Sequence, residues 1–285
     1  MFADRGPADR VDARHVLPTP AGWTGERFSL GYRVTEAFLA LIALGMVAGA
    51  VWAYLADEPV AGSLLAAGSV FVGHLVGFST SVSRMRRPPG RNPTLVPSPD
   101  GTTKGVRFGY SPWPYYWLAT LLIMIELSTL VLTVAVAASG TLLGIVVAVV
   151  SGALAVGVGW FLVTVLRLAP GEVTVSPAGV FHRSLTHIHF VPWYAITEVE
   201  ARWLGSPIIA VKAYPSEDTG VRRYMGRFGT GELRFLPIMV IRTYWLATDP
   251  ATIYHALSFY QTHPDLQAEL ATPAALDRIG NGRTV

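Results

Sequence analysis

Four long apolar runs dominate the pattern of polar and hydrophobic positions. They extend from about Val34 to Ala56, Val60 to Val82, Pro114 to Ala138 and Thr141 to Leu166. Each is long enough to cross the hydrocarbon core of a bilayer as a helix, which takes about 20 residues. Core helices of water-soluble proteins seldom stay apolar on every face over that length. The pattern therefore predicts a bundle of four transmembrane helices within residues 32–168.

Basic residues between the apolar runs indicate one orientation. Five arginines precede the first run, and the connection over residues 83–113 holds six basic residues against one acid. The two short turns, at Asp57-Glu58 and Ser139-Gly140, hold no basic residue. Cytoplasmic loops are enriched in Lys and Arg. We therefore expect a multi-pass protein of a prokaryotic plasma membrane, with both termini and the basic loop 83–113 in the cytoplasm.

Three segments lack the large apolar side chains that a folded core needs. Residues 1–31 are rich in Arg, Asp, Pro and Gly, residues 271–285 are similar, and the central loop is rich in proline over residues 88–99. Such segments bury too little surface to order themselves, and proline favours extended chain. We expect a mobile N-terminal segment, a mobile tail and an extended connection between the second and third helices.

The periodicity changes after Arg167 to the alternation typical of β-strands. Short strands are predicted at 173–176, 180–185, 187–191, 196–203 and 208–214, with a further β-rich stretch at 233–243. Asp249-Pro250 then caps a helix over Pro250 to Thr262, with apolar residues at helical spacing. Short strands separated by turns indicate a small antiparallel sandwich or barrel. We expect it over residues 169–270, covered by the helix.

Two stretches of this region resemble a known family. Val175 to Val180 (VSPAGV) and Val191 to Ile196 (VPWYAI) look like the opening strands of bacterial pleckstrin-homology-like domains, and Asp249 to Leu270 is similar to the family's closing helix. With the preceding spans, the chain resembles an actinobacterial-type integral membrane protein. The resemblance implies a partly open β-barrel capped by a C-terminal helix. It also implies a binding or assembly module rather than an enzyme.

Composition excludes several classes of function. The chain is 51% hydrophobic and only 14% charged, whereas soluble domains carry about 25% charged residues. It contains no cysteine, which excludes disulfides and thiolate metal sites. A net charge of +3 is too small to indicate a nucleic-acid partner. No nucleophile is followed by an adjacent base, so we predict neither an enzyme nor a cofactor.

Two ionisable residues lie within the predicted membrane helices. His74 is in the second apolar run and Glu126 is at the middle of the third. A charge at the bilayer centre costs at least about 2.5 kcal/mol, so Glu126 is expected to face a partner. The estimated depths of Glu126 and His74 differ by only about 5 Å, so a hydrogen bond between the two side chains is geometrically reasonable. Two interpretations remain open: a structural contact between helices, or a proton relay.

Other polar clusters indicate contact with lipid rather than metal. Arginines near a membrane surface each gain about 1 kcal/mol from anionic headgroups, and seven are candidates: Arg84, Arg86, Arg87, Arg91, Arg222, Arg223 and Arg227. His187 and His189 share one face of a strand near His182, but no acidic or cysteine ligand lies at suitable spacing. We predict no metal site.

These patterns predict a membrane-anchored cytoplasmic module that acts as a scaffold or accessory subunit for a membrane-associated protein assembly. The expected partners are the bilayer and another membrane or membrane-associated protein. Glycines four apart, such as Gly45 with Gly49 and Gly73 with Gly77, allow close helix packing and also a homo-oligomer. The alternative function is a small transporter or proton-coupled subunit that uses Glu126 and His74.

Overall fold

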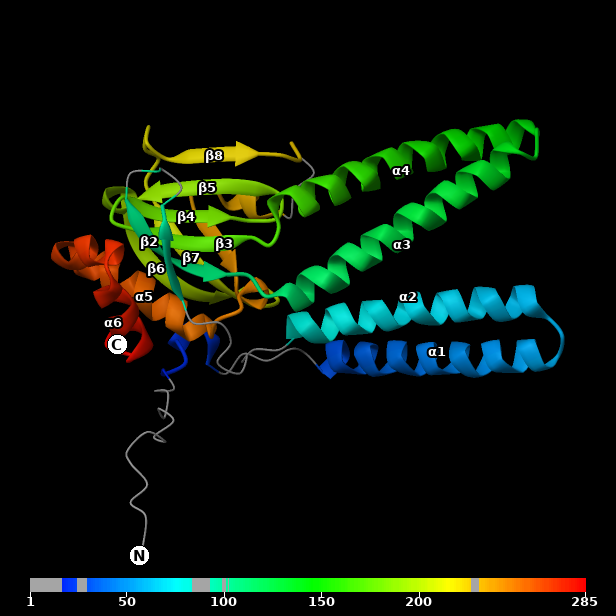
Figure 1. Ribbon diagram of the computed structural model, residues 1–285, viewed down its shortest axis with the longest axis horizontal. Helices are drawn as coiled ribbons and strands as arrows, with labels where there is room; N and C mark the ends of the chain where they lie inside the picture. Colours follow the sequence, from blue (N-terminus) through cyan, green and yellow to red (C-terminus); the bar gives the residue numbers. More distant parts are fainter. Residues whose placement is uncertain (1–16, 25–29, 84–92, 99–100, 102, 227–230) are drawn as a thin grey trace, which may run out of the picture.

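Four long helices and an antiparallel β-domain make up the protein (Figure 1). The structure, a computed structural model, describes residues 17–24, 30–83, 93–98, 101, 103–226 and 231–285. The long helices are α1 (Leu30–Leu55), α2 (Pro59–Ser83), α3 (Pro112–Ala137) and α4 (Leu142–Leu168). All four are long and apolar enough to cross a membrane, which confirms the prediction of four long apolar helices that could span a bilayer.

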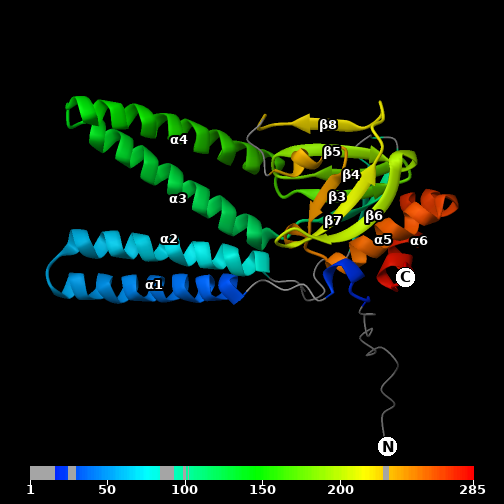
Figure 2. The same cartoon turned by 180° about the vertical axis from the view of Figure 1, so that it is seen from behind.

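The helices form two antiparallel hairpins rather than one closed bundle. α1 packs along α2 and α3 packs along α4, whereas α2 and α3 make fewer contacts. The hairpins lie closest beside the β-domain and diverge away from it (Figures 1 and 2). A β-carbon at Gly77 would lie 2.7 Å from the Trp117 ring, whereas Gly45 and Gly73 face open space. Only some of the glycine pairs therefore serve packing between the helices.

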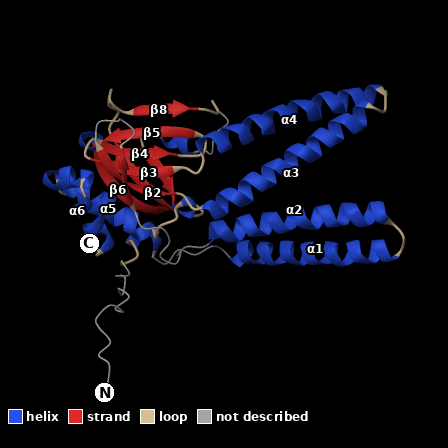
Figure 3. Cartoon of the chain, viewed as in Figure 1, coloured by secondary structure: helices blue, strands red, loops and turns tan. Residues whose placement is uncertain are grey.

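Two antiparallel sheets build the domain (Figure 3). The six-stranded sheet has the order β1-β2-β3-β4-β5-β8, and the three-stranded sheet has the order β6-β7-β9. The strands are β1 (Thr94–Pro97), β2 (Lys104–Gly109), β3 (Glu172–Ser176), β4 (Gly179–Arg183), β5 (His187–Pro192), β6 (Ile196–Trp203), β7 (Pro207–Ala213), β8 (Gly220–Arg223) and β9 (Met239–Arg242). Over the described residues the sheets do not close into a barrel.

The central loop is not merely an extended connection, because part of it belongs to the sheet. β2 pairs with β3 in a regular antiparallel register, with Val106 opposite Val175 and Phe108 opposite Val173. Val106 and Phe108 are fully buried. Val106 and Phe108 alternate with Arg107 and Gly109, and this is a strand signal that the neighbouring prolines obscure. The domain therefore includes residues before α3 as well as residues after α4, and it extends beyond the expected bounds 169–270.

Parts of both terminal segments also pack on the domain. The Trp23 indole is buried and donates to the Arg202 and Ile208 carbonyl oxygens, both at 3.1 Å. In the segment expected to be a mobile tail, the short helix α6 (Pro273–Gly280) buries Ala275 and Ile279. In the described part of each segment a few side chains are buried, which the polar composition does not reveal.

The closing helix α5 (Pro250–Thr262) has the predicted bounds and cap. The Asp249 carboxylate accepts from the Ala251 amide at 2.9 Å, and Pro250 occupies the first turn. The helix buries its apolar stripe, including Leu257 and Tyr260, in the core of the domain. A capped helix with one apolar face gains its stability mainly from this packing.

The core of the domain continues into the membrane helices. One cluster of buried side chains joins Val173 and Ile241 of the sheets to Leu122 of α3 and Val165 of α4. At the end of α2, Phe78 lies 6.3 Å from the Trp245 ring, centroid to centroid. The cis Ala169-Pro170 bond and Gly171 lead directly from α4 into β3, with no linker. The domain is therefore packed against the hairpins rather than tethered below them.

Replacing Phe108 by Ala tests whether the central loop belongs to the domain. A fully buried phenylalanine lost from a core costs about 3 to 5 kcal/mol, so Phe108→Ala is expected to lower the midpoint of thermal unfolding by several degrees in detergent. Lys104→Ala on the same strand removes an exposed side chain and serves as the matched control. Equal midpoints for the two variants would contradict the role of β2 in the core.

Candidate functional site

His74 does not reach Glu126. Its ring meets the Trp117 ring edge-on, with centroids 5.0 Å apart, and its Nδ1 lies 2.8 Å from the Val70 carbonyl oxygen. Trp117 is near the start of α3, and Glu126 lies nine residues further along, about 13 Å by helical rise. His74 is therefore in an aromatic contact at the domain end of the helices.

Glu126 faces its own hairpin partner, α4. A β-carbon at Gly159 would lie 3.3 Å from Glu126 Oε1, so the absence of a side chain there makes room for the carboxyl group. Oε2 is buried and has no hydrogen-bond partner among the described residues. The expected pair with His74 is absent because the two hairpins diverge. As positioned, the two groups form no continuous path for a proton.

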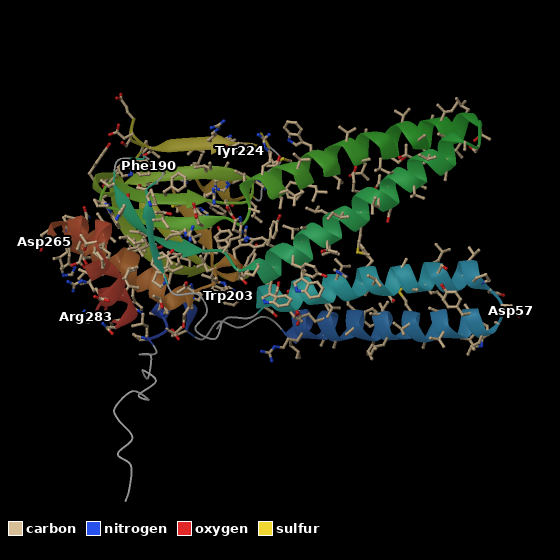
Figure 4. The ribbon with its side chains drawn as sticks, in the orientation of Figure 1. Asp57, Phe190, Trp203, Tyr224, Asp265 and Arg283 are labelled. Carbon is tan, nitrogen blue, oxygen red and sulfur yellow. The ribbon has the colours of Figure 1, made fainter. Side chains whose placement is uncertain are left out.

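Two of the candidate arginines lie on the edge strand of the six-stranded sheet. Arg222 and Arg223 are exposed on β8, which pairs with β5. Arg222 lies over the Tyr224 ring, 5.1 Å from its centroid. Tyr224 is at the end of the sheet nearest α4, whereas Phe190 is at the far end (Figure 4). The strand therefore leads these side chains toward the membrane helices. Arg84, Arg86, Arg87, Arg91 and Arg227 lie outside the described residues.

A buried polar cluster occupies the core face of the six-stranded sheet. The register aligns Phe108, Val173, His182, His189 and Val221 across five strands. His182, His187 and His189 are each at most 2% exposed. The three histidines are visible in the sequence, but histidines at every second position are also typical of an exposed sheet face. Only the packing of the second sheet and the helices places them inside.

Hydrogen bonds satisfy part of this cluster. Tyr110, just before α3, lies with its hydroxyl 2.6 Å from His182 Nε2. Glu232 is buried, accepting from Ser184 Oγ at 3.0 Å and from Arg242 Nε at 3.1 Å. Its Oε2 is also 3.6 Å from His187 Nε2. The cluster thus links the start of a membrane helix to the three-stranded sheet through β4.

Burial sets the charge of the histidines. It lowers the pKa of His182 well below its usual range, and lowers that of His189 to about 4. The pKa of His187 is also lowered to about 4, by burial first and then by His189 and Arg223. Among the described residues, His182 Nδ1 and His189 Nε2 have no hydrogen-bond partner. The cluster is therefore a neutral network around one paired carboxylate.

The arrangement offers little for metal or covalent chemistry. Within the described residues, no group of three or more His, Asp or Glu side chains is placed to hold a metal ion. His182 and His187 lie edge to face, with ring centroids 5.7 Å apart, rather than converging on one point. What the cluster does supply is sensitivity to acid, because its histidines are buried in the neutral form.

Acid is expected to destabilise the domain through these histidines. Their folded pKa lies below the unfolded value of about 6.5, so the unfolded chain binds more protons and stability falls as the pH drops from about 6.5 toward 4. At about 1.4 kcal/mol per pKa unit, the protonation of His189 alone lowers the free energy of unfolding by on the order of 3 kcal/mol once the pH is below its folded pKa.

The variant His189→Leu should therefore weaken the dependence of the unfolding midpoint on pH between 7 and 4.5. This substitution removes a buried ring whose Nε2 has no partner among the described residues, and the leucine side chain fills the same apolar site. His263→Gln, at an exposed position, is the control and should keep the parental dependence. An unchanged pH dependence in His189→Leu would show that His189 does not titrate as its burial requires.

Comparison with known proteins does not place the chain in a family. No protein-family model, no curated protein and no solved structure matches it. What the protein does must therefore be argued from its own helices, its sheets and the exposed surface of its domain.

Proposed function

We propose that this protein is a membrane-anchored scaffold, or an accessory subunit, of a membrane-associated protein assembly. Its four helices cross the plasma membrane, and its β-domain presents a binding surface on the cytoplasmic side. The observation that carries this proposal is the continuous apolar core between domain and helices. A domain fixed in this way holds any bound partner at a set position relative to the bilayer.

We propose further that the domain is pleckstrin-homology-like. Three consecutive strands, β3 to β5, lie in one sheet, β6, β7 and β9 lie in the other, and the capped helix α5 follows directly. This order fits the resemblance of residues 171–270 to that family. The strands β1 and β2, from between the membrane helices, would be an addition that joins the domain to its anchor.

The cytoplasmic placement is supported by the arrangement of the helices. Both hairpins begin and end beside the β-domain, while Asp57 lies at the opposite tip of the first hairpin (Figure 4). The domain and the basic loop therefore share one side, and the turns without basic residues lie on the other. By the positive-inside tendency the basic side is cytoplasmic.

Single cysteines test this topology, because the natural chain contains none. Asp57→Cys and Asp265→Cys replace exposed residues at the helix tip and on the domain. A membrane-impermeant maleimide added to intact cells should label the first variant and not the second, while permeabilised cells should show both labelled. Labelling at position 265 from outside the cell would overturn the cytoplasmic placement.

An aromatic surface on the domain is the best candidate for partner binding. Tyr194 and Tyr214 are 69% and 67% exposed. They are neighbours, because the Tyr214 amide donates to the Ala195 carbonyl. The Tyr194 hydroxyl also bonds Asp218. Tyr194 directly follows β5, and Phe190 of that strand lies at the end of the sheet far from the helices (Figure 4). Exposed tyrosines are enriched in protein interfaces.

A photoreactive amino acid in place of Tyr214 tests this surface in native membranes. We expect a discrete adduct with another protein, reduced at least about fivefold by Tyr194→Ser in the same chain, since interface aromatics often contribute more than 1 kcal/mol. The same probe at Leu204, in the exposed turn between β6 and β7, should not give that adduct. Adducts unaffected by Tyr194→Ser, or equal at both positions, would contradict the proposal.

A transporter or proton-coupled subunit is the second candidate function. The buried, unpartnered Oε2 of Glu126 favours it, because an ionisable group in a membrane helix often marks a transport path. Against it, His74 is in contact with Trp117 instead, so the proposed relay would need a further group. The scaffold therefore remains the better supported proposal.

A further inference from the structure

An open groove of about 500 Å³ lies between α1 and α2 at the end of the hairpin nearest the β-domain. Arg33 and Glu36 of α1 line its outer end together with Thr80 and Ser83 of α2. This end of both helices is where the chain enters and leaves the membrane. The groove is therefore at the height of the lipid headgroups, and none of the residues discussed above contributes to it.

The polar end of the groove offers one cation and one anion. Ser79 Oγ donates to Glu36 Oε1 at 2.8 Å, which fixes the carboxylate between the two helices. Arg33 lies three residues earlier on the same helix, about 4.5 Å along its axis. No ion pair among the described residues includes Arg33, and Glu36 Oε1 also accepts from Ser83 Oγ at 3.5 Å. Both charges are thus available to a ligand that carries the opposite pair.

The inner end of the groove is apolar. Ala37 and Ala40 of α1 and Val76 of α2 line it, below the charged pair. Ala40 lies seven residues beyond Arg33, about 10 Å further into the membrane. The small side chains of Ala37 and Ala40 on α1 leave room for a hydrocarbon chain beside Val76. The groove therefore changes from charged to apolar in the same direction as a lipid molecule in the inner leaflet.

We propose that this groove binds a phospholipid with a primary amine in its headgroup, of the phosphatidylethanolamine class. The ammonium group donates hydrogen bonds to Glu36, the phosphate accepts them from Arg33, and an acyl chain lies along Ala37 and Ala40. A choline headgroup has no N–H to donate, and an anionic headgroup without an amine would leave Glu36 uncompensated. The inference rests on the membrane placement of α1 and α2 and not on the scaffold role.

Native mass spectrometry of the full-length, delipidated protein in detergent tests this site. Palmitoyl-oleoyl lipids with ethanolamine, choline or glycerol headgroups are titrated separately. We expect the ethanolamine lipid to bind about tenfold more tightly than the choline lipid, as a charge-assisted hydrogen bond allows. Glu36→Gln should remove this preference and leave choline-lipid binding unchanged, and Arg33→Gln should weaken the binding of both.

Arg167→Gln is the matched control, because Arg167 is an exposed arginine in the last turn of α4 and does not line the groove. Its lipid binding should equal that of the parent. Equal affinity for the three lipids, a preference for the glycerol lipid, or an ethanolamine preference that survives Glu36→Gln would each overturn the proposal. Each variant's unfolding midpoint shows whether it remains folded. Partner crosslinking at Tyr214 is read independently, so either proposal can fail alone.

Discussion

The apolar contact between the membrane hairpins and the β-domain is the interaction on which the structure depends. Phe78 of α2, Tyr110 before α3 and Val165 of α4 all pack into the cluster that also holds the sheets together. Tyr110 and Trp245 stack with nearly parallel rings, 6.1 Å apart. Burial of this surface favours one arrangement of domain and helices, because separating them would expose apolar side chains to water.

This contact also explains the way the domain is assembled from separate stretches of chain. Trp23 packs beside β6. Strands β1 and β2 lie between the two hairpins in the sequence, and the remaining strands follow α4. Among the described residues, the chain before α3 and the chain after α4 are thereby part of one folded body. A partner bound to such a body would be held near the helices by this packing, and this is the basis of the scaffold proposal.

Two polar clusters lie at different places in the protein: one at the end of the first helix hairpin nearest the β-domain, and one buried inside the β-domain. Glu36 and Ser79 bridge the first hairpin at its domain end, and Glu232 with Arg242 lies inside the domain. Glu126 is different, because its carboxyl group lies within an apolar hairpin opposite Gly159. Glu36 and Glu232 thus have hydrogen-bonding partners, whereas Oε2 of Glu126 is buried and has none among the described residues.

The sequence by itself determined the elements whose stabilising pattern is local. The four apolar runs became helices within a few residues of their expected bounds, and α5 begins at the proline after its Asp249 cap. The hairpin of β4 and β5 also follows from alternation and a turn. In each case length, periodicity or a cap is visible within one stretch of chain.

Tertiary structure alone decided which distant residues meet. It placed Val106 and Phe108 beside β3, His182 and His189 in a buried row, and His74 against Trp117. It also enclosed Ile279, in a tail whose composition indicates mobility. The physical reason is that burial and pairing depend on how helices and sheets pack together, and a depth estimated along each helix does not fix which residues of neighbouring helices meet.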